Sequence, residues 1–357
     1  MGKLVLKYRH KVMCGDSTNG DHIERLMAGN KAALLHADPP YGMGKQSDGV
    51  ANDNLYRENL DAFQMDWWAG FRPFLTDNAS AYIWGNAPDL WRLWYRGGLG
   101  DSEKLEIRTE IVWDKKAIPG MKSGLLTQYP EASERCLFFQ FGDQFLGNVN
   151  TGDFPLEWEE VQGYLQNQAE SLRIGPQDIK RINGVGMYSH WFTKSQFTLI
   201  PEKHYIALQE QYPNGFSKDW KELKKEWDKV KDVLTRKVQG ARSYFDNAHD
   251  AMRDVWEFSR VTGEERHTHA TPKPVAMMER VMLSSLPKDG LCVEPFAGSG
   301  STLIGAEKTG RRCYTMELQG NYCDVIIKRW QDFTGKQAVL ESTGQTFAEL
   351  EAERIGH

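Results

Sequence analysis

Short apolar runs alternate with a helical pattern in the first 142 residues of the chain. Four runs have the length and the apolar content of buried strands, and they cover residues 31–37, 79–86, 108–115 and 135–142. The first two runs are separated by a helical pattern, ENLDAFQMDWWAGFRPFL, at 58–75. Strands that alternate with helices predict an α/β sheet for this part of the chain.

The pattern changes after Gly142. Residues 143–251 are polar, rich in Gln, Trp, Lys and Glu, and show little strand signal. One amphipathic helix is predicted there from apolar residues at helical spacing: Trp220, Leu223, Trp227, Val230 and Leu234. We expect this apolar stripe to pack against the body of the protein rather than to bind a partner.

The α/β pattern returns near Pro272. A helix is predicted over 271–285, a strand over 291–294, a glycine-rich turn over 295–300, a helix over 301–308 and a strand over 314–317. The chain is therefore expected to have two α/β halves, at 1–142 and 252–335. A mainly helical insert at 143–251 separates them, and a tail follows at 336–357.

Composition narrows the class of protein. The chain has 357 residues, of which 40% are hydrophobic and 26% charged, as in globular proteins. We expect neither a membrane span, because no long uncharged apolar run occurs, nor a signal peptide, because the start has no continuous apolar stretch. Its five cysteines form no Cys-x-x-Cys pair, which favours a reducing cytoplasm over a zinc or disulfide framework. The net charge of −5 argues against nucleic-acid binding unless positive charge is concentrated locally.

The glycine-rich turn suggests a cofactor. It follows the strand that ends at Glu294, and the next strand ends in a second acid, Glu317, a little over 20 residues later. An acid in that position commonly accepts hydrogen bonds from ribose hydroxyls, so the pair predicts a nucleoside cofactor. A phosphate-binding P-loop would need a lysine after Gly300, and a dinucleotide site a third glycine, and both are missing. The alternative is a tight strand–helix turn without a ligand.

Four short motifs together resemble a known family. DPPY stands at Asp38–Tyr41 and EPFAGSGST at Glu294–Thr302, while HATPKPVAMMERVM stands at His269–Met282 and CGD at Cys14–Asp16. In this order they resemble the β-class DNA amino-methyltransferases, which use S-adenosylmethionine. The resemblance covers about residues 10–142 and 252–335. Glu294 departs from that family's usual Asp, and alone DPPY could be an ordinary turn.

The resemblance implies a fold and a reaction. The fold would be a Rossmann-like, mostly parallel sheet flanked by helices, the class I methyltransferase fold in permuted order, with the helical insert recognising the target. The reaction would be site-specific methylation of adenine N6 in a base flipped out of duplex DNA. Asp at the first position of DPPY favours adenine over cytosine. The implied catalytic residues are Asp38, Pro39, Pro40 and Tyr41.

Alternatives to this function remain open at the level of sequence. The same enzyme class could act on cytosine N4, or the chain could be a catalytically silent DNA-binding homologue, against which the intact DPPY argues. Methylation of RNA or of a protein amide is a further alternative. The partner implied by the resemblance is double-stranded DNA. Relatives often form homodimers, and some work beside a cognate restriction enzyme in restriction–modification, so a second copy of the chain and a restriction enzyme are further possible partners.

The resemblance also assigns residues to the cofactor. Phe296 would pack on its methionine part, Gly298–Thr302 would line the amino acid moiety, Glu317 would hold the ribose and Asp16 would reach the adenine. Lys273 could equally be a solvated surface lysine, and Ser301 and Thr302 could be helix caps. The full implied set is Asp16, Ser17, Thr271, Lys273, Pro274, Glu294, Pro295, Phe296, Gly298, Ser299, Gly300, Ser301, Thr302, Glu317 and Leu318.

Local positive charge occurs in the insert. Residues 172–208 are predicted as helix, Gly-containing turn and helix, similar to a helix-turn-helix, although short helix pairs are also common structural elements. Residues 218–237 carry eight Lys or Arg against five Asp or Glu, either for DNA or as a solvated helix face. His267 and His269 lack further metal ligands, so a structural or phosphate-side role is favoured. The expected phosphate contacts are Lys180, Arg181, His190 and Lys194.

Overall fold

The computed structural model divides the chain into two compact units. Unit 1 comprises Met1–Asp143 and Ser243–His357, and unit 2 comprises Gln144–Arg242. The insert predicted at 143–251 thus begins near the start of unit 2 and ends somewhat beyond it. The structure describes residues 3–6, 9–40, 42, 55, 58–95, 106–115, 132–142, 158–194, 197–239, 242–247, 249–250, 252–261 and 272–355.

Unit 1 is built on one mixed sheet. In the described residues its strand order is β10-β1-β2-β9-β8-β3-β4-β6-β5-β7. The five central strands, from β2 to β4 in that order, are all parallel, and the hairpins at both sides are antiparallel. The strands are β1 Lys3–Leu6, β2 His10–Cys14, β3 Ala32–Ala37, β4 Leu75–Gly85, β5 Glu106–Asp114, β6 Ser133–Gln140, β7 Val255–Glu257, β8 Leu291–Glu294, β9 Arg312–Glu317 and β10 Val339–Leu340.

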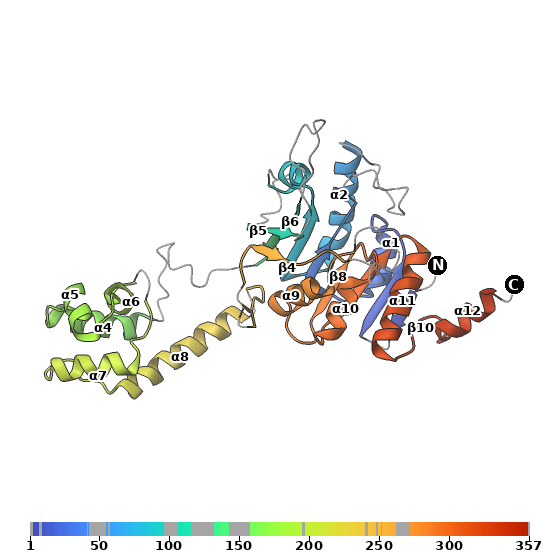
Figure 1. Ribbon diagram of the computed structural model, residues 1–357. Coiled ribbons are helices and arrows are strands. Elements are labelled where there is room, and N and C mark those ends of the chain that lie inside the picture. The colour runs from blue at the N-terminus through green and yellow to red at the C-terminus, as the bar shows by residue number, and fades with distance from the viewer. Residues whose placement is uncertain are drawn as a thin grey trace. The chain divides into compact units, whose positions relative to one another are not determined.

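Helices cover both faces of this sheet (Figure 1). Met278, Leu303 and Ile326 bring α9, α10 and α11 into one hydrophobic cluster with the sheet, whereas Leu26 and Trp67 bring α1 and α2 into the other. Strands covered on two faces are mostly apolar, and every residue of β8 is buried, including Glu294 at its end. The helices of unit 1 are α1 Gly20–Met27, α2 Glu58–Phe71, η2 Arg72–Phe74, α3 Ala87–Asp89, η3 Leu90–Tyr95, α9 Val275–Ser285, α10 Ser301–Lys308, α11 Gly320–Thr334 and α12 Phe347–Ile355.

The parallel core follows from the sequence pattern. The α/β fold with a mostly parallel centre is as predicted, and the strands expected at 31–37, 79–86, 108–115, 135–142, 291–294 and 314–317 are all present within a few residues. The pattern missed β1, β2, β7 and β10, which have five residues or fewer, and their signals are weak because few residues contribute to each. The tail, which carried no prediction, adds β10 beside β1 and ends in α12.

The two motif-bearing strands are neighbours in the sheet. Leu34 of β3 pairs with Cys292 of β8, and β8 in turn pairs with β9 through Val293 and Tyr314. β9 pairs with β2, the strand that precedes the CGD motif. Segments more than 250 residues apart therefore end at the same edge of one parallel sheet, because parallel strands share the direction of their carboxyl ends.

Unit 2 is helical and has a core of its own. That core contains Leu165, Ile179, Trp191, Leu208 and Leu223, among others. The range predicted as two helices contains three, α5, α6 and α7, and the described residues 197–201 before α7 are neither helix nor strand. The helices are α4 Glu159–Ser171, α5 Pro176–Asn183, α6 Tyr188–Phe192, α7 Glu202–Gln211 and α8 Trp220–Gln239.

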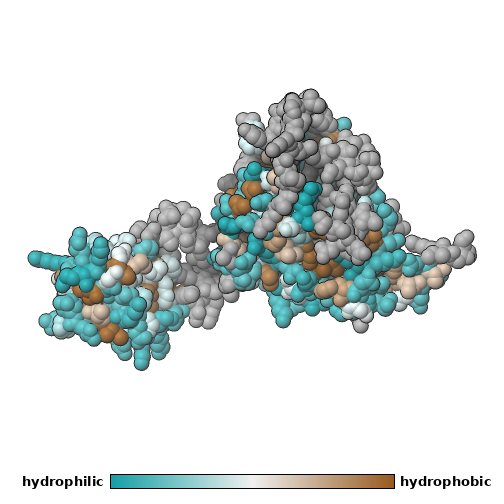
Figure 2. All heavy atoms as spheres, in the orientation of Figure 1, coloured by the Kyte–Doolittle hydropathy of each residue, from teal (hydrophilic) through white to brown (hydrophobic). Residues whose placement is uncertain are grey.

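The first part of the apolar stripe of α8, from Trp220 to Trp227, packs into the core of unit 2 itself, and the side chain of Leu234 lies outside the described residues. Leu223 is fully buried, and the ring of Trp227 lies 5.0 Å from that of Trp158 and 5.4 Å from that of Phe197. The face of unit 2 in Figure 2 is mostly hydrophilic, with a few hydrophobic residues scattered over it. None of the helices in the described ranges combines the length and the apolar character that crossing a bilayer requires.

Gly305 sets how closely α10 approaches α9. A Cβ atom at Gly305 would lie 2.8 Å from Met278 Cβ and 3.1 Å from the carbonyl carbon of Met278. Overpacking of this kind costs about 1–3 kcal/mol, more than the roughly 1 kcal/mol that alanine gains over glycine in a helix. We expect Gly305→Ala to lower the free energy of unfolding, measured by denaturant titration.

Gly163 provides the matched control. It also lies inside a helix, α4, but a Cβ atom there would meet nothing within 4 Å. Gly163→Ala is expected to leave stability unchanged or raise it. Equal effects at the two glycines would contradict the close packing of α9 on α10.

Candidate active site

The carboxyl ends of four parallel strands meet at one edge of the sheet. β3 is followed by Asp38, β8 by Pro295, β9 by Leu318 and β2 by Gly15. Open α/β sheets bind ligands at this edge, in front of the strand ends. Most of the residues singled out from the sequence thus come together, because the topology gathers the ends of their strands.

The glycine-rich turn between β8 and α10 needs its glycines. Gly298 and Gly300 have φ angles of 52° and 79°, in the left-handed region. A Cβ atom on Gly300 would also lie 2.9 Å from Ile326 Cγ2. The backbone of this turn can therefore run close to α11 and still open toward the edge, where the backbone N–H groups at the start of α10 lie.

Glu317 is held by backbone donors at the end of β9. Its two carboxylate oxygens accept hydrogen bonds from the N–H of Gly298 at 2.9 Å and of Gln319 at 3.0 Å. Burial raises the pKa of Glu317 to about 7, and the negative charge of Glu294 adds to this, although the two N–H donors favour the carboxylate. The turn and the acid predicted to hold a ribose are thus joined directly.

The N-terminal motif also reaches this turn. The hydroxyl of Ser17 donates a 2.5 Å hydrogen bond to the carbonyl of Pro295. Asp16 is half-buried, and its carboxylate accepts hydrogen bonds from the N–H and the hydroxyl of Thr18. Leu318 is exposed at the same edge. These contacts tie β2, β8 and β9 together at one side of the site.

Helix α2 links the two main motifs. Gln64 donates a 3.1 Å hydrogen bond to the carbonyl of Pro40 and accepts one of 2.7 Å from the indole N–H of Trp67. The ring of Trp67 in turn lies edge-on to that of Phe296, 5.5 Å between centroids. One helix therefore fixes both the loop after β3 and the aromatic residue of the turn after β8.

Asp38 is the first in a row of four neighbouring side chains whose charges alternate in sign. Lys273 Nζ lies 2.6 Å from Asp38 Oδ2 and 3.1 Å from Glu134 Oε2. The other oxygen of Glu134 lies 2.6 Å from Lys115 Nζ. The side chain of Lys273 is 6% exposed and that of Asp38 is 23% exposed. The ammonium is therefore buried, whereas solvent or a ligand can reach the carboxylate of Asp38.

The pKa values in this row reflect the pairing. Burial alone raises the pKa of Glu134, but the ammonium groups of Lys273 and Lys115 outweigh burial and lower it to about 2. Burial alone lowers the pKa of Lys273, but Asp38 and Glu134 outweigh it and raise that pKa above its ordinary value. Each buried charge is therefore kept ionised by its neighbours of opposite sign.

A second polar chain lies beneath the edge and couples β3 to β8. The indole N–H of Trp84 donates to His36 Nε2 at 2.9 Å, so the proton of the neutral ring is assigned to Nδ1. His36 Nδ1 lies 3.1 Å from the hydroxyl of Thr302 and 3.5 Å from Glu294 Oε1. Glu294 Oε2 accepts a further hydrogen bond, of 2.9 Å, from the Thr315 hydroxyl. Glu294 is therefore buried and hydrogen-bonded within unit 1, and its role toward the cofactor stays a prediction.

Ser301 and Thr302 do not cap their helix. The N-cap of α10 is Gly300, and no side chain caps it. The Thr302 hydroxyl meets His36, and the Ser301 hydroxyl lies 3.3 Å from Arg329 Nη1, which also donates a 2.9 Å hydrogen bond to the carbonyl of Ser299. The capping alternative is thus wrong, because both hydroxyls contact side chains outside α10 and not the N–H groups at its start.

The described contacts of Lys273 are with the Asp38 side of the site. The alternative of a solvated surface lysine is wrong, because the side chain is buried between Asp38, Glu134 and the rings of Trp84 and Trp113. Its neighbour Pro274 is buried at the N-cap of α9. A role of these two residues toward the cofactor stays a prediction. Four residues named from the sequence, Tyr41, Thr271, His267 and His269, lie outside the described residues.

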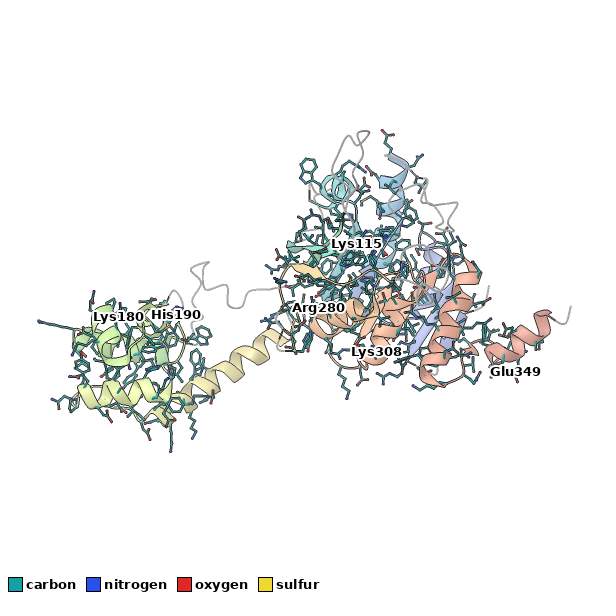
Figure 3. All side chains as sticks on the ribbon, viewed as in Figure 1. Lys115, Lys180, His190, Arg280, Lys308 and Glu349 are labelled. Carbon is teal, nitrogen blue, oxygen red and sulfur yellow. The ribbon has the colours of Figure 1, made fainter. Side chains whose placement is uncertain are left out.

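The predicted DNA contacts all lie in unit 2. Figure 3 labels Lys180 on α5 and His190 on α6. Arg181 forms an ion pair of 3.0 Å with Asp178, and Lys194 one of 2.6 Å with Glu159, with all four side chains partly or largely exposed. Exposed pairs of this kind are weak and can be exchanged for phosphate contacts.

Sequence reasoning missed four polar residues of this edge. Gln64, Lys115, Glu134 and His36 belong to none of the motifs. The one local signal was a histidine in an otherwise apolar strand, since His36 interrupts the run AALLHA. Lys115 and Glu134 reach the site only through the pairing of β5 with β6, in which Trp113 stands opposite Glu134.

A family model described as DNA methylase, covering N6 and N4 amino-methyltransferases, matches residues 32–329. This range contains both the DPPY and the EPFAGSGST segments, and it makes up most of the chain. The protein belongs to the N6/N4 DNA methylase family. The family matches the predicted resemblance, and the parallel sheet matches the predicted fold.

Individual relatives agree with this assignment. The chain is 38% identical over 82 residues to the type II methyltransferase M.ScaI of Streptomyces caespitosus, a match that covers 21% of this chain and 27% of that relative. It is 28% identical over 213 residues to M2.MboI of Moraxella bovis, which covers 54% of this chain and 75% of that relative. The chain thus matches about a quarter of the length of the first relative and three quarters of the second.

Two solved methyltransferase structures are similar to this chain at low sequence identity. The M1.HpyAVI–SAM complex has a TM-score of 0.48 at 13% identity, covering 90% of this chain and 99% of that one. The cytosine-N4-specific PvuII DNA methyltransferase has a TM-score of 0.46 at 11% identity, covering 90% of this chain and 86% of that one.

The raised pKa of Glu317 makes a prediction about stability. Its folded-state pKa of about 7 lies above the ordinary value of 4.5, so the stability that protonated Glu317 contributes is fully present below pH 4.5 and is lost as pH rises through 7. Glu317→Gln imitates the protonated acid. We expect it to be more stable than the wild type at pH 8, because each tenfold change in proton affinity between the folded and unfolded states corresponds to about 1.4 kcal/mol.

The measurement is the free energy of unfolding without ligand, from pH 4 to pH 9. The advantage of Glu317→Gln should vanish at the acid end of this range. Glu24→Gln, which changes an exposed glutamate on α1, is the control and should show no such pH dependence. If the stability of Glu317→Gln relative to the wild type did not rise between pH 4 and pH 8, the raised pKa of the buried carboxylate would be refuted. This change with pH decides, because glutamine also loses one of the two acceptor oxygens.

Proposed function

We propose that the protein is a DNA adenine-N6 methyltransferase that acts on a base flipped out of the duplex. The methyl donor is S-adenosylmethionine. The observation that carries the proposal is the pairing of β3 with β8, because Asp38 and the turn after Glu294 then follow neighbouring strands at one edge. Methyl transfer needs a donor site and an acceptor site that face each other across a short gap.

The residues around the turn suit S-adenosylmethionine. Glu317 can accept hydrogen bonds from ribose hydroxyls, and Asp16 can do the same for the amino group of the cofactor's adenine. The open backbone from Gly298 to Thr302 can line the amino acid moiety, and Phe296 can pack on the aliphatic part beside it. The cofactor supplies an activated methyl group with a positive charge on sulfur.

Asp38 can prepare the target nitrogen. The lone pair of an aromatic amino group is delocalised into the ring, so it has to be localised and directed before it can attack a methyl group. A carboxylate and a backbone carbonyl that both accept from the amino group achieve this, and they stabilise the positive charge that develops on nitrogen. Since Pro40 O already accepts from Gln64, we assign the backbone role to Pro39 O.

Adenine is the base we favour, because Asp begins the DPPY segment. The family includes enzymes that methylate cytosine N4 as well, and the carboxylate chemistry suits either amino group. Nucleosides released from treated DNA separate the two, since N6-methyladenine and N4-methylcytosine differ in mass. We expect the enzyme in the cytoplasm, while a homodimer and a cognate restriction enzyme stay predictions from the family resemblance.

The direct test uses unmethylated phage DNA, S-adenosylmethionine and mass spectrometry of the nucleosides. The wild type should produce N6-methyl-2′-deoxyadenosine. Asp38→Ala should lose methyl transfer by at least about 100-fold, since it removes both geometry and charge stabilisation, and should still bind the cofactor in calorimetry.

Asp332→Ala is the control for this test, because Asp332 is exposed on α11. It should retain wild-type activity. If N4-methylcytosine is the sole product, the target base is cytosine and not adenine. Full activity of Asp38→Ala would refute the assigned mechanism.

Unit 2 is the part we assign to target DNA. Its exposed basic side chains on α5 and near α6 can contact phosphates, and such contacts weaken as salt concentration rises. Lys180→Ala should weaken binding to duplex DNA of any sequence and reduce the slope of log K against log salt by about 1.

Lys224→Ala is the comparison variant in the same unit. Lys224 lies on α8 and pairs with Asp228 four residues later. Its replacement should change the salt slope less than Lys180→Ala does. Identical slopes for the wild type and Lys180→Ala, measured by fluorescence anisotropy, would exclude Lys180 from the DNA interface.

A further inference from the structure

Glu134 stands outside every motif, yet it is the second carboxylate of the site. It belongs to β6, and its carboxylate lies between the ammonium groups of Lys273 and Lys115. One of its oxygens, Oε2, is buried and accepts no well-aligned hydrogen bond from any described residue, although Lys273 Nζ is only 3.1 Å away. A buried carboxylate oxygen without such a bond is costly, so it is ready to take one.

We propose that Glu134 is a positioning residue for methyl transfer: it takes over the ammonium of Lys273 when Asp38 turns to the amino group of the target base. This inference rests on the proposed function. In the structure, Lys273 donates a 2.6 Å hydrogen bond to Asp38 Oδ2. The base has to compete with that bond, and it can do so only if the lysine has another acceptor within reach.

The surroundings of Lys273 hold its ammonium close to both carboxylates. The ammonium lies 4.9 Å from the ring centroid of Trp84 and 5.9 Å from that of Trp113. With 6% of its side chain exposed, Lys273 cannot exchange a carboxylate for bulk water. A small movement between Asp38 and Glu134 keeps the buried charge paired throughout, and the indole faces stabilise the cation along the way.

The sign of the charges favours the reaction. Asp38 and Lys273 alone sum to zero, which leaves little negative charge for the cation that forms on the target nitrogen. With Glu134 included, the net charge of the three side chains is −1 (−1 + 1 − 1). When the ammonium of Lys273 moves from Asp38 to Glu134, the negative charge of Asp38 becomes available to the nitrogen. Lys115 completes a neutral set of four, which lets the row be buried when no base is bound.

Four variants test this role. Glu134→Gln removes the charge and keeps the shape, and Glu134→Asp keeps the charge. Glu134→Gln/Lys115→Met removes both members of an ion pair and so keeps the balance of buried charge. Glu110→Gln is the matched control, since Glu110 forms an exposed ion pair with Arg135 across the same two strands. Each is assayed with labelled S-adenosylmethionine and unmethylated phage DNA.

The expected result is a loss in kcat. Glu134→Gln should lower kcat by about 10- to 100-fold, the range of a hydrogen bond to a charged group, and leave the KM for S-adenosylmethionine within about twofold. Glu134→Asp should recover most of this loss, and Glu110→Gln should match the wild type. The charge-balanced double variant should show the same loss as Glu134→Gln, which separates the effect from folding.

The pH profile distinguishes positioning from a structural role. Among the described residues, the titratable groups that interact with Lys273 include Asp38, Glu134 and Cys136, with Lys115 beyond Glu134. Removal of one of its two carboxylates lowers the pKa of Lys273, so the alkaline fall of kcat should begin at lower pH in Glu134→Gln. A merely structural role would reduce kcat by the same factor at every pH.

The outcomes separate this inference from the proposed function. Wild-type kcat and an unshifted alkaline limb in Glu134→Gln, or in the double variant if the single one does not fold, would overturn the role of Glu134. If the wild type itself transferred no methyl group to DNA, the proposed function would fail, and the inference with it. An active wild type beside an equally active Glu134→Gln would refute the inference alone.

Discussion

The parallel pairing of β3 with β8 is the constraint on which the site depends. It joins Leu34 to Cys292 and Leu35 to Val293, and so brings Asp38 beside the turn that follows Glu294. The chain between them includes the whole of unit 2. Since the entropy of closing a loop grows only with the logarithm of its length, by about 0.6 kcal/mol per doubling, an insert of this size costs the sheet little. A separate helical unit can therefore be carried between the two halves of the α/β fold.

Buried ions of alternating sign give this edge its chemical character. On the Asp38 side, Lys273 and Glu134 keep each other ionised, and the pKa of Glu134 is lowered to about 2. On the other side, burial raises the pKa of Glu317 to about 7, although two backbone N–H groups bind its carboxylate. The two ends of the edge thus differ in how strongly a negative charge is compensated. That difference suits a positively charged methyl donor held between them.

The sequence predicts the parts of this site that are local. DPPY, the glycine-rich turn and Glu317 each follow an apolar strand, and in an α/β fold such positions converge at one edge. It does not predict Glu134, Lys115 or Gln64, because their roles arise from the pairing of β5 with β6 and the packing of α2. Similarly, β1 and β10 are too short to give a recognisable pattern. The range expected to form a helix-turn-helix in unit 2 contains three helices, of which α6 has only five residues.

A crystal structure with bound S-adenosylmethionine would test the central claim most directly, namely that a methyl donor held by the turn after β8 faces the carboxylate after β3. The account predicts the ribose hydroxyls on Glu317, the sulfonium beside Phe296 and the methyl group directed toward Asp38. A cofactor bound away from Glu317, or one whose methyl group points away from Asp38, would contradict it.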